Sequence, residues 1–275
     1  GGDSAVKVFG KIFTAVIFIL LYAPIFVLVA LSFNTSKSTV MFDGFTFQWY
    51  KELFTNSNLM GLLLNTLILA VTSSVVATLL GTTAALGISK MKKRTRNLVM
   101  SVTNIPMSNP EIVTGVSLAL LFVFVGTWLK IDDVLGFGTL FIAHVTFNLP
   151  YVILSVMPKL RGLDRTMIDA ALDLGCTPAQ AFRKITLPEI MPGVVSGFVM
   201  AFTLSLDDFV ISYFVSGSTF TTLPVEIYNY TKKPMSPTIY ALFTLMFLII
   251  LILLLVMNIA DIRRDKKKAA LYGRT

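Results

Sequence analysis

The chain has 275 residues, of which 55% are hydrophobic and only 14% are charged, and its mean hydropathy is +0.78. Soluble domains carry about 25% charged residues, so this composition excludes an ordinary soluble protein and favours an integral membrane protein. The net charge of +8 does not favour nucleic-acid binding, because the basic residues gather in short runs between apolar segments, as they do in membrane proteins.

Six apolar segments are long enough to cross a bilayer, which takes about 20 helical residues. We therefore expect an all-α integral membrane protein with a single transmembrane domain over residues 1–275. The first segment is longer than the apolar core of a signal peptide, about 7–15 residues, and is expected to be a retained helix. In chain order the predicted spans are 12–33, 59–89, 97–127, 138–158, 191–216 and 237–260.

The distribution of Lys and Arg predicts the orientation. Basic runs occur at 90–96 ("KMKKRTR"), within 159–190 and in the tail 263–268 ("RRDKKK"), whereas the alternate loops carry fewer basic residues. Loops rich in Lys and Arg stay in the cytoplasm, so both termini are expected there.

The sequence holds no motif for catalysis. It contains no G-x-x-x-x-G-K-[ST] phosphate loop and no H-E-x-x-H motif, so nucleotide hydrolysis and zinc proteolysis are not expected. A single cysteine, Cys176, excludes an internal disulfide. The one histidine, His144, makes no metal site by itself, and we expect it to be hydrogen-bonded or to face water.

The third apolar segment is interrupted by "NIPMSNPEIVTG", residues 104–115. Asn109, Pro110 and Glu111 form a helix-start pattern, in which Asn caps, Pro takes the first position and an acid complements the positive helix end. A helix is therefore predicted to restart at Pro110. Glu111 either serves the local helix dipole or lines a cavity, as acids beside helix breaks do in transporters.

Between the fourth and fifth spans, "DAALDLGCTPAQAFRKITLP" (169–188) predicts an elbow of two short helices over 164–188. Gly175 is expected to stop the first helix. Thr177 and Pro178 are expected to start the second, and Leu187-Pro188 to end it. The apolar side of such an elbow suits a groove on another protein.

The spacing of Asp169-Ala-Ala, Gly175 and Ile185-x-Leu187-Pro188 resembles the "EAA" signature of permease subunits of binding-protein-dependent ABC importers. The family has Glu where this chain has Asp169, which keeps the charge with a shorter reach. The resemblance implies a type I importer permease fold in which the elbow is the coupling helix that docks on an ATPase. The docking residues it implies are Asp169, Ala170, Ala171, Gly175, Phe182, Ile185, Leu187 and Pro188.

The segments "LSFNTS" (31–36), "GFTFQWY" (44–50), "MSNPEIV" (107–113), "VTFNLPYV" (145–152) and "FTLSLDDFVISYFVSG" (202–217) are similar to the permeases of spermidine/putrescine importers. The resemblance is to the second of the two paired permease chains. It implies a non-catalytic permease in a bacterial inner membrane. It also implies the partners: a homologous permease, two ATPase subunits and an extracytoplasmic polyamine-binding protein. The chain itself would need no cofactor, since ATP and Mg²⁺ would bind to the ATPase.

Asp207 and Asp208 lie side by side in the predicted fifth span, where an unpaired charge is costly. At helical spacing Ser205, Asp208, Ser212 and Ser216 share a polar stripe, and Asp207 points about 100° away. Asp208 is then the better candidate for a water-filled pathway, while Asp207 would pair with a backbone group, a neighbouring helix or the partner permease. The alternative for both acids is hydrogen bonding between helices or a salt bridge to the second permease. No Lys or Arg lies in a predicted span to pair with these acids. The predicted pathway residues for a cationic cargo are Asp208, Asp207, Glu111, Ser212, Tyr213 and Tyr240.

Three alternatives stay open from the residues alone. A related importer could carry thiamine or iron, whereas sulfate is disfavoured by the acids. A self-contained cation channel or secondary transporter would leave the elbow without a role. An intramembrane aspartyl protease needs two acids on facing helices, which adjacent Asp residues do not provide.

Overall fold

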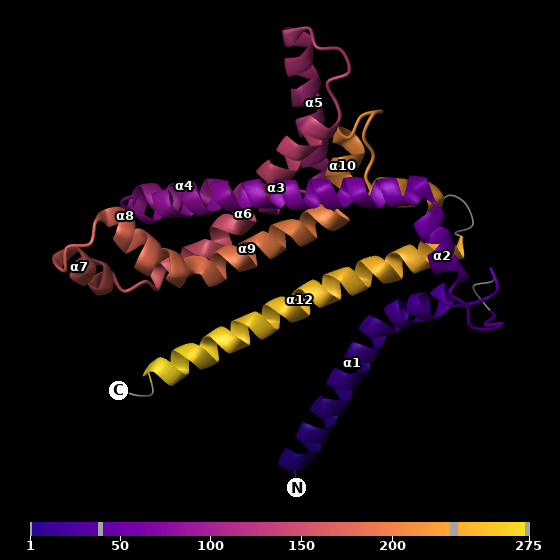
Figure 1. Cartoon of the computed structure of the whole chain (residues 1–275), viewed down its shortest axis with the longest axis horizontal. Coiled ribbons are helices and arrows are strands. Elements are labelled where there is room, and N and C mark those ends of the chain that lie inside the picture. Colours follow the sequence, from indigo (N-terminus) through magenta and orange to yellow (C-terminus); the bar gives the residue numbers. More distant parts are fainter. Residues whose placement is uncertain (1, 38–40, 232–235, 273–275) are drawn as a thin grey trace. The chain divides into compact units, whose positions relative to one another are not determined.

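The computed structural model describes residues 2–37, 41–231 and 236–272. The side chains of 2–8, 165, 231, 257–258 and 260–272, which include the basic tail, are not described. The described part is nearly all helical (Figure 1). Among its helices, six are long and apolar enough to cross a membrane, which confirms the predicted number. The candidate spans are Phe9–Ser32, Ser57–Ser89, Glu111–Leu129, Phe137–Arg161, Pro178–Asp207 and Pro237–Val256.

The chain forms two compact units, residues 1–60 with 230–275, and residues 61–229. In the first unit, α12 (Pro237–Tyr272) packs against α1 (Gly2–Ser32) and α2 (Gln48–Thr55).

The first unit brings two of the short motifs together. Asn34 pairs with Phe45 in an isolated antiparallel bridge, and the indole Nε1 of Trp49 donates to the carbonyl of Asn34 over 2.6 Å. The rings of Phe33 and Phe45 stack 4.9 Å apart. The motifs at 31–36 and 44–50 therefore build one aromatic turn between α1 and α2.

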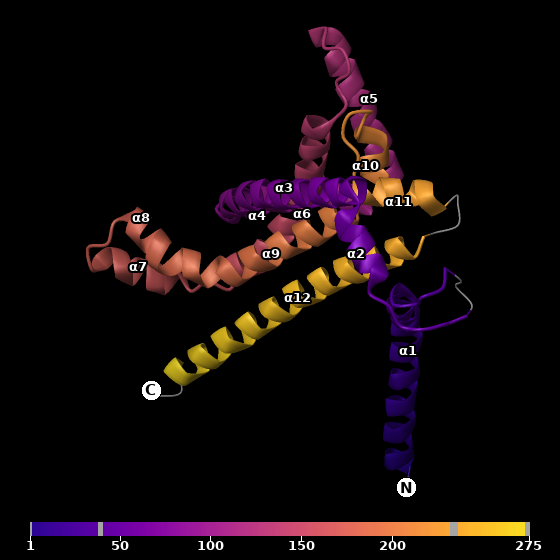
Figure 2. The ribbon, with the colours of Figure 1, turned by 45° about the vertical axis from the view of Figure 1, so that its right-hand side comes forward.

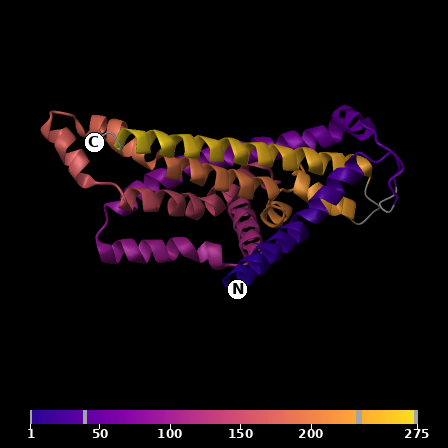
Figure 3. The same cartoon turned by 90° about the horizontal axis from the view of Figure 1, so that it is seen from below.

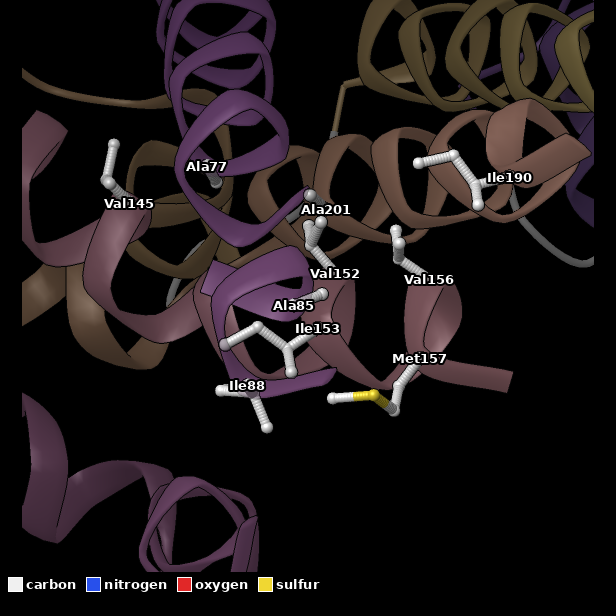
Figure 4. Close-up of a cluster of buried hydrophobic side chains, with 10 residues drawn as sticks. All are labelled: Ala77, Ala85, Ile88, Val145, Val152, Ile153, Val156, Met157, Ile190 and Ala201. Atoms are coloured by element: carbon white, nitrogen blue, oxygen red, sulfur yellow. The ribbon is translucent and has the colours of Figure 1, made fainter. Parts of the chain in front are cut away.

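The second unit holds most of α3 (Ser57–Ser89) and α11 (Leu223–Thr231), with all the helices between them. Its main core lies where α3, α6 (Phe137–Arg161) and α9 (Leu187–Asp207) meet (Figure 4). The core side chains are Ala77, Ala85, Ile88, Val145, Val152, Ile153, Val156, Met157, Ile190 and Ala201.

Small residues allow α6 and α9 to approach closely. A Cβ atom built on Gly193 would lie 2.7 Å from the carbonyl oxygen of Ser155, and one on Gly197 would lie 3.2 Å from Val152. Such small-xxx-small pairs bring helix backbones together in membranes, where apolar burial between helices gives little driving force.

Gly193→Ala is therefore expected to destabilise the protein by about 1–3 kcal/mol, because the backbones must separate. Gly87→Ala, on α3 with open space around it, is the control and should be neutral or slightly stabilising. Thermal unfolding of both purified variants tests this. Equal midpoints would mean that the close approach of α6 and α9 does not limit stability.

The third apolar segment forms two helices, α4 (Lys93–Ser108) and α5 (Glu111–Leu129). The predicted restart is confirmed to within one residue, since α5 begins at Glu111. The predicted cap is wrong: Asn109 ends α4, and Pro110 occupies the N-cap of α5 without a side-chain hydrogen bond. Pro106 lies inside α4, so the break occurs only at the second proline.

The elbow consists of α7 (Arg165–Asp173) and α8 (Pro178–Ala181). Asp164 caps α7 by accepting the backbone N–H and hydroxyl of Thr166, and these hydrogen bonds lower the pKa of Asp164. Gly175 ends the first helix with φ +86°, a backbone conformation that favours glycine. Thr177 and Gln180 form a capping box at α8. The predicted stop and restart are confirmed.

The predicted end at Leu187-Pro188 is wrong. A π-helical turn, Phe182–Thr186, joins α8 directly to α9, so helix runs unbroken over the 30 residues Pro178–Asp207. This wider turn precedes Pro188, whose ring nitrogen has no hydrogen to donate. The elbow and Asp207 are therefore at opposite ends of one continuous helix.

Candidate functional site

The helix containing the two aspartates breaks at Asp208. α9 ends at Asp207, Asp208 takes an extended conformation with ψ 116°, and a short helix α10 (Val210–Val215) follows. The predicted stripe of Ser205, Asp208 and Ser212 required one unbroken helix, so that geometry is wrong. The elbow and α10 lie at opposite ends of α9 (Figures 1 and 2).

The side chain of Asp208 points into a buried contact between α6 and α10. Its carboxylate accepts hydrogen bonds from the backbone N–H of Ile211 (3.3 Å) and Ser212 (2.8 Å) and from the Ser212 hydroxyl (2.8 Å). An acid is stabilised at the positive start of a helix. The break at Asp208 thus lets its side chain close the first turn of α10.

His144 is the basic partner that the sequence analysis did not find. Its Nε2 atom lies 3.4 Å from Oδ2 of Asp208 and 3.1 Å from Oγ of Ser212. The side chains of His144 and Asp208 are only 2% and 6% exposed. The expectation of a hydrogen-bonded His144 is confirmed, and the expectation that Asp208 has no basic partner is wrong.

A second polar contact lies one turn further along α6, where it meets α9 and α3. Asn148 Nδ2 donates to Ser205 Oγ over 2.7 Å, and Ser205 Oγ lies 3.2 Å from Ser73 Oγ on α3. His144 and Asn148 are four residues apart and share one face of α6. That spacing is the sequence signal for a polar face on α6 opposite the serines of the fifth span.

Beside the break is an open pocket of about 450 Å³. One wall is the start of α5, where Glu111 lies, another is α10 with its flanking residues, and Tyr228 of α11 completes the lining. A Cβ atom built on Gly115 of α5 would lie 3.3 Å from the Cα atom of Ile211, so glycine allows the two walls to meet. The lining residues are Pro110, Glu111, Ile112, Phe209, Val210, Tyr213, Phe214 and Tyr228.

Aromatic rings dominate this pocket. Phe209 lies 4.7 Å from Tyr228 and 5.5 Å from Tyr213, measured between ring centroids. Tyr213 is 48% exposed and Tyr228 is 42% exposed. A carboxylate beside accessible aromatic faces is suited to an ammonium group. We refer to Glu111, Phe209, Tyr213 and Tyr228 as the acid–aromatic pocket.

The other predicted pathway residues divide between the two units. Asp207 is exposed at the end of α9 and lies within electrostatic range of Glu111. Tyr240 lies on α12 in the first unit and is half-buried there, and its part in a pathway stays a prediction. The sequence analysis missed Phe209 and Tyr228. Phe209 is four residues before Tyr213, but nothing in the sequence relates either residue to Tyr228.

The elbow presents two different faces. Ile168, Asp169 and Leu172 of α7, with Phe182, line a pocket of about 810 Å³ between the elbow and the ends of α3 and α6. On the other side of α7, Met167 is 46% exposed and Leu174 is 86% exposed.

The remaining docking residues implied by the resemblance lie along this elbow. Ala170, Gly175 and Pro188 are exposed, and Ala171, Ile185 and Leu187 are half-buried. The outward apolar face is thus formed by Met167, Ala170 and Leu174, and the sequence analysis did not include Met167.

Six spans, a helical elbow and an open acid–aromatic pocket define a multi-pass membrane permease component. Residues 77–265 match the family of binding-protein-dependent transport system inner membrane components, and the chain belongs to this family.

Curated relatives are polyamine permeases. The chain is 39% identical to the spermidine/putrescine transport system permease protein PotC of Escherichia coli K12, over 85% of this chain and 86% of that protein. It is 41% identical to the putrescine transport system permease protein PotI of the same strain, over 83% and 82% of the two chains. The predicted resemblance is therefore confirmed, and the chain is a transport permease of a non-catalytic family.

Solved structures support the fold. The chain is similar to a chain of a bacterial alginate ABC transporter in complex with an alginate pentasaccharide-bound periplasmic protein, with a TM-score of 0.72, 16% identity and 96% of both chains covered. It is also similar to a chain of the inward-facing MetNI methionine ABC transporter, with a TM-score of 0.56 and 19% identity, covering 78% of this chain and 99% of that chain. These likenesses confirm the predicted type I permease fold.

Proposed function

We propose that this permease carries polyamines into the cytoplasm as one half of a translocation pathway. The observation that carries the proposal is the acid–aromatic pocket, which Glu111 lines together with Phe209, Tyr213 and Tyr228. A polyamine is a linear multivalent cation with apolar methylene stretches, so carboxylates and aromatic walls match its chemistry. The names of the relatives PotC and PotI support the same cargo.

Within this proposal the acids have different roles. Glu111 and Asp207 are exposed and lower the barrier for a passing cation, and Tyr213 lines its route. Asp208 and Ser212 act as positioning residues, because the Ser212 hydroxyl hydrogen-bonds with His144 and the Asp208 carboxylate lies 3.4 Å from Nε2 of His144, which holds α10 against α6.

Membership of the family supports a set of partners. The chain pairs with a homologous permease, binds two ATPase subunits through the elbow and receives cargo from an extracytoplasmic polyamine-binding protein. ATP and Mg²⁺ belong to the ATPase. The basic residues in 90–96 and 159–184 support a cytoplasmic position for the elbow and both termini.

The continuous helix supports a mechanism for coupling. Residues 178–207 extend about 45 Å at 1.5 Å per residue, and they connect the elbow to the break at Asp208. Closure of the ATPases on ATP moves the elbow. The helix carries this movement to α10 and so changes access to the acid–aromatic pocket.

Leu174→Asp is expected to reduce co-purification of the ATPase at least about tenfold, because it places a charge on the exposed apolar face of the elbow. Leu174→Met keeps the apolar side chain and should retain the ATPase. The measurement is the amount of ATPase recovered with the tagged permease. Equal recovery with both variants would remove this face from the docking surface.

The cargo is tested in vesicles that contain the complete transporter with its binding protein. Uptake of radiolabelled spermidine, putrescine, thiamine and ferric iron is compared with ATP inside and outside. ATP-dependent uptake of a polyamine, without uptake of thiamine or iron, is the expected result. Uptake of thiamine or iron in place of polyamines would refute the cargo, and uptake by the permease chain alone would refute the importer mechanism.

A further inference from the structure

The pocket between the elbow and the ends of α3 and α6 is basic. Lys90, Arg96 and Arg161 line it, and Asp169 is the one acid among its lining residues. Within the part of the chain that the structure describes, no ion pair or side-chain hydrogen bond neutralises these three cations. The pocket therefore keeps an excess of positive charge.

Arg96 gives the clearest indication that this pocket binds an anionic group. Its Nε atom is buried and has no hydrogen-bond partner among the described residues. A buried charged donor without a partner is costly. A guanidinium group binds phosphate oxygens with charge-assisted, often bidentate, hydrogen bonds.

The position of the pocket points to lipid. Arg161 is the last residue of the candidate span Phe137–Arg161, and Lys90 directly follows the candidate span Ser57–Ser89, so both lie at the ends of helices that are apolar enough to cross the bilayer. The rest of the wall is largely apolar and includes Leu86, Leu160 and Phe182. Basic pockets between membrane helices bind anionic lipid headgroups. The apolar wall would contact the part of an acyl chain nearest the headgroup.

We propose that this pocket binds the phosphate headgroup of an anionic phospholipid and thereby supports the elbow from the membrane side. The outward face of Met167 and Leu174 stays free for the ATPase. The inference does not depend on the cargo, and the position of the pocket at the ends of two spans holds for either orientation of the chain.

The test uses the complete transporter, purified in detergent and depleted of lipid. It is titrated with palmitoyl-oleoyl phosphatidylglycerol, with phosphatidylcholine of the same chains and with inorganic phosphate, and bound lipid is measured by native mass spectrometry. The tightest phosphatidylglycerol site is expected to bind at least about tenfold more tightly than any phosphatidylcholine site, and Arg96→Gln should weaken it about tenfold.

Arg94→Gln is the matched control, because Arg94 is exposed in the same basic run but does not line the pocket. It should leave phosphatidylglycerol binding unchanged. Lys90→Gln and Arg161→Gln change exposed pocket residues and should weaken binding even if Arg96→Gln does not assemble. Binding that is unchanged in the pocket variants overturns the proposal. Displacement of the lipid by millimolar phosphate would assign the site to a soluble anion instead.

Discussion

Replacing Asp208 by alanine is expected to destabilise the permease by about 3 kcal/mol. The change leaves the backbone N–H groups of Ile211 and Ser212 and the Ser212 hydroxyl without their shared acceptor. It also removes the carboxylate beside His144, whose side chain is only 2% exposed. The measurement is thermal unfolding of the purified transporter, in which the midpoint should fall by at least about 6 °C.

Asp207→Ala is the matched control, because it makes the same substitution at the neighbouring aspartate. Asp207 is exposed at the end of α9, so its loss should change stability by less than about 0.5 kcal/mol. A double-mutant cycle of Asp208→Ala and His144→Ala should give a coupling energy above about 0.5 kcal/mol. Equal midpoints for the two aspartate variants, or additive effects in the cycle, would show that Asp208 does not hold α10 to α6.

Replacing Glu111 by glutamine is expected to lower spermidine uptake at least about tenfold at subsaturating cargo, while the transporter still assembles. The amide keeps the size of the side chain but removes the charge from the wall of the acid–aromatic pocket. One charge-assisted interaction with an ammonium group is worth about 1.5–3 kcal/mol. The measurement is the initial rate of ATP-dependent uptake in vesicles of the complete transporter, together with ATP hydrolysis in the same vesicles.

The control for Glu111 is Asp132→Asn, which removes an acid from the exposed loop between α5 and α6. Uptake should be unchanged in this variant, since Asp132 does not line the pocket. Tyr213→Leu keeps an apolar side chain but removes the ring, and a loss of uptake there would support cation–π contact. If Glu111→Gln and Asp132→Asn transport equally well, the acid–aromatic pocket is not on the route of the cargo.

Local chemistry in the sequence was sufficient for several features. Length and hydropathy predicted six spans, because the bilayer fixes how many apolar residues a crossing helix needs. The cap at Thr177 and the stop at Gly175 were predictable, since these contacts form between residues at most five positions apart. The restart near Pro110 was predictable for the same reason, although Asn109 does not cap α5.

The arrangement of the aspartates was not predictable in this way. Asp208 and Ser212 form a stripe only on an unbroken helix, and the break is stabilised by His144, which is more than 60 positions away in the chain. The elbow likewise continues into α9, because a wider helical turn precedes Pro188. Tyr228 joins the pocket from a third helix.

The sequence by itself determined that this protein is a six-span membrane protein with a helical elbow, because apolar length and capping depend on neighbours along the chain. Only the tertiary structure decided which carboxylates are buried and which are exposed. Packing between α6 and α10 gives Asp208 a partner and turns it inward, while the meeting of α5 with α10 at Gly115 leaves Glu111 beside accessible aromatic rings. Such contacts depend on which helices pack together, and the spacing of residues along one helix does not determine which helices do so.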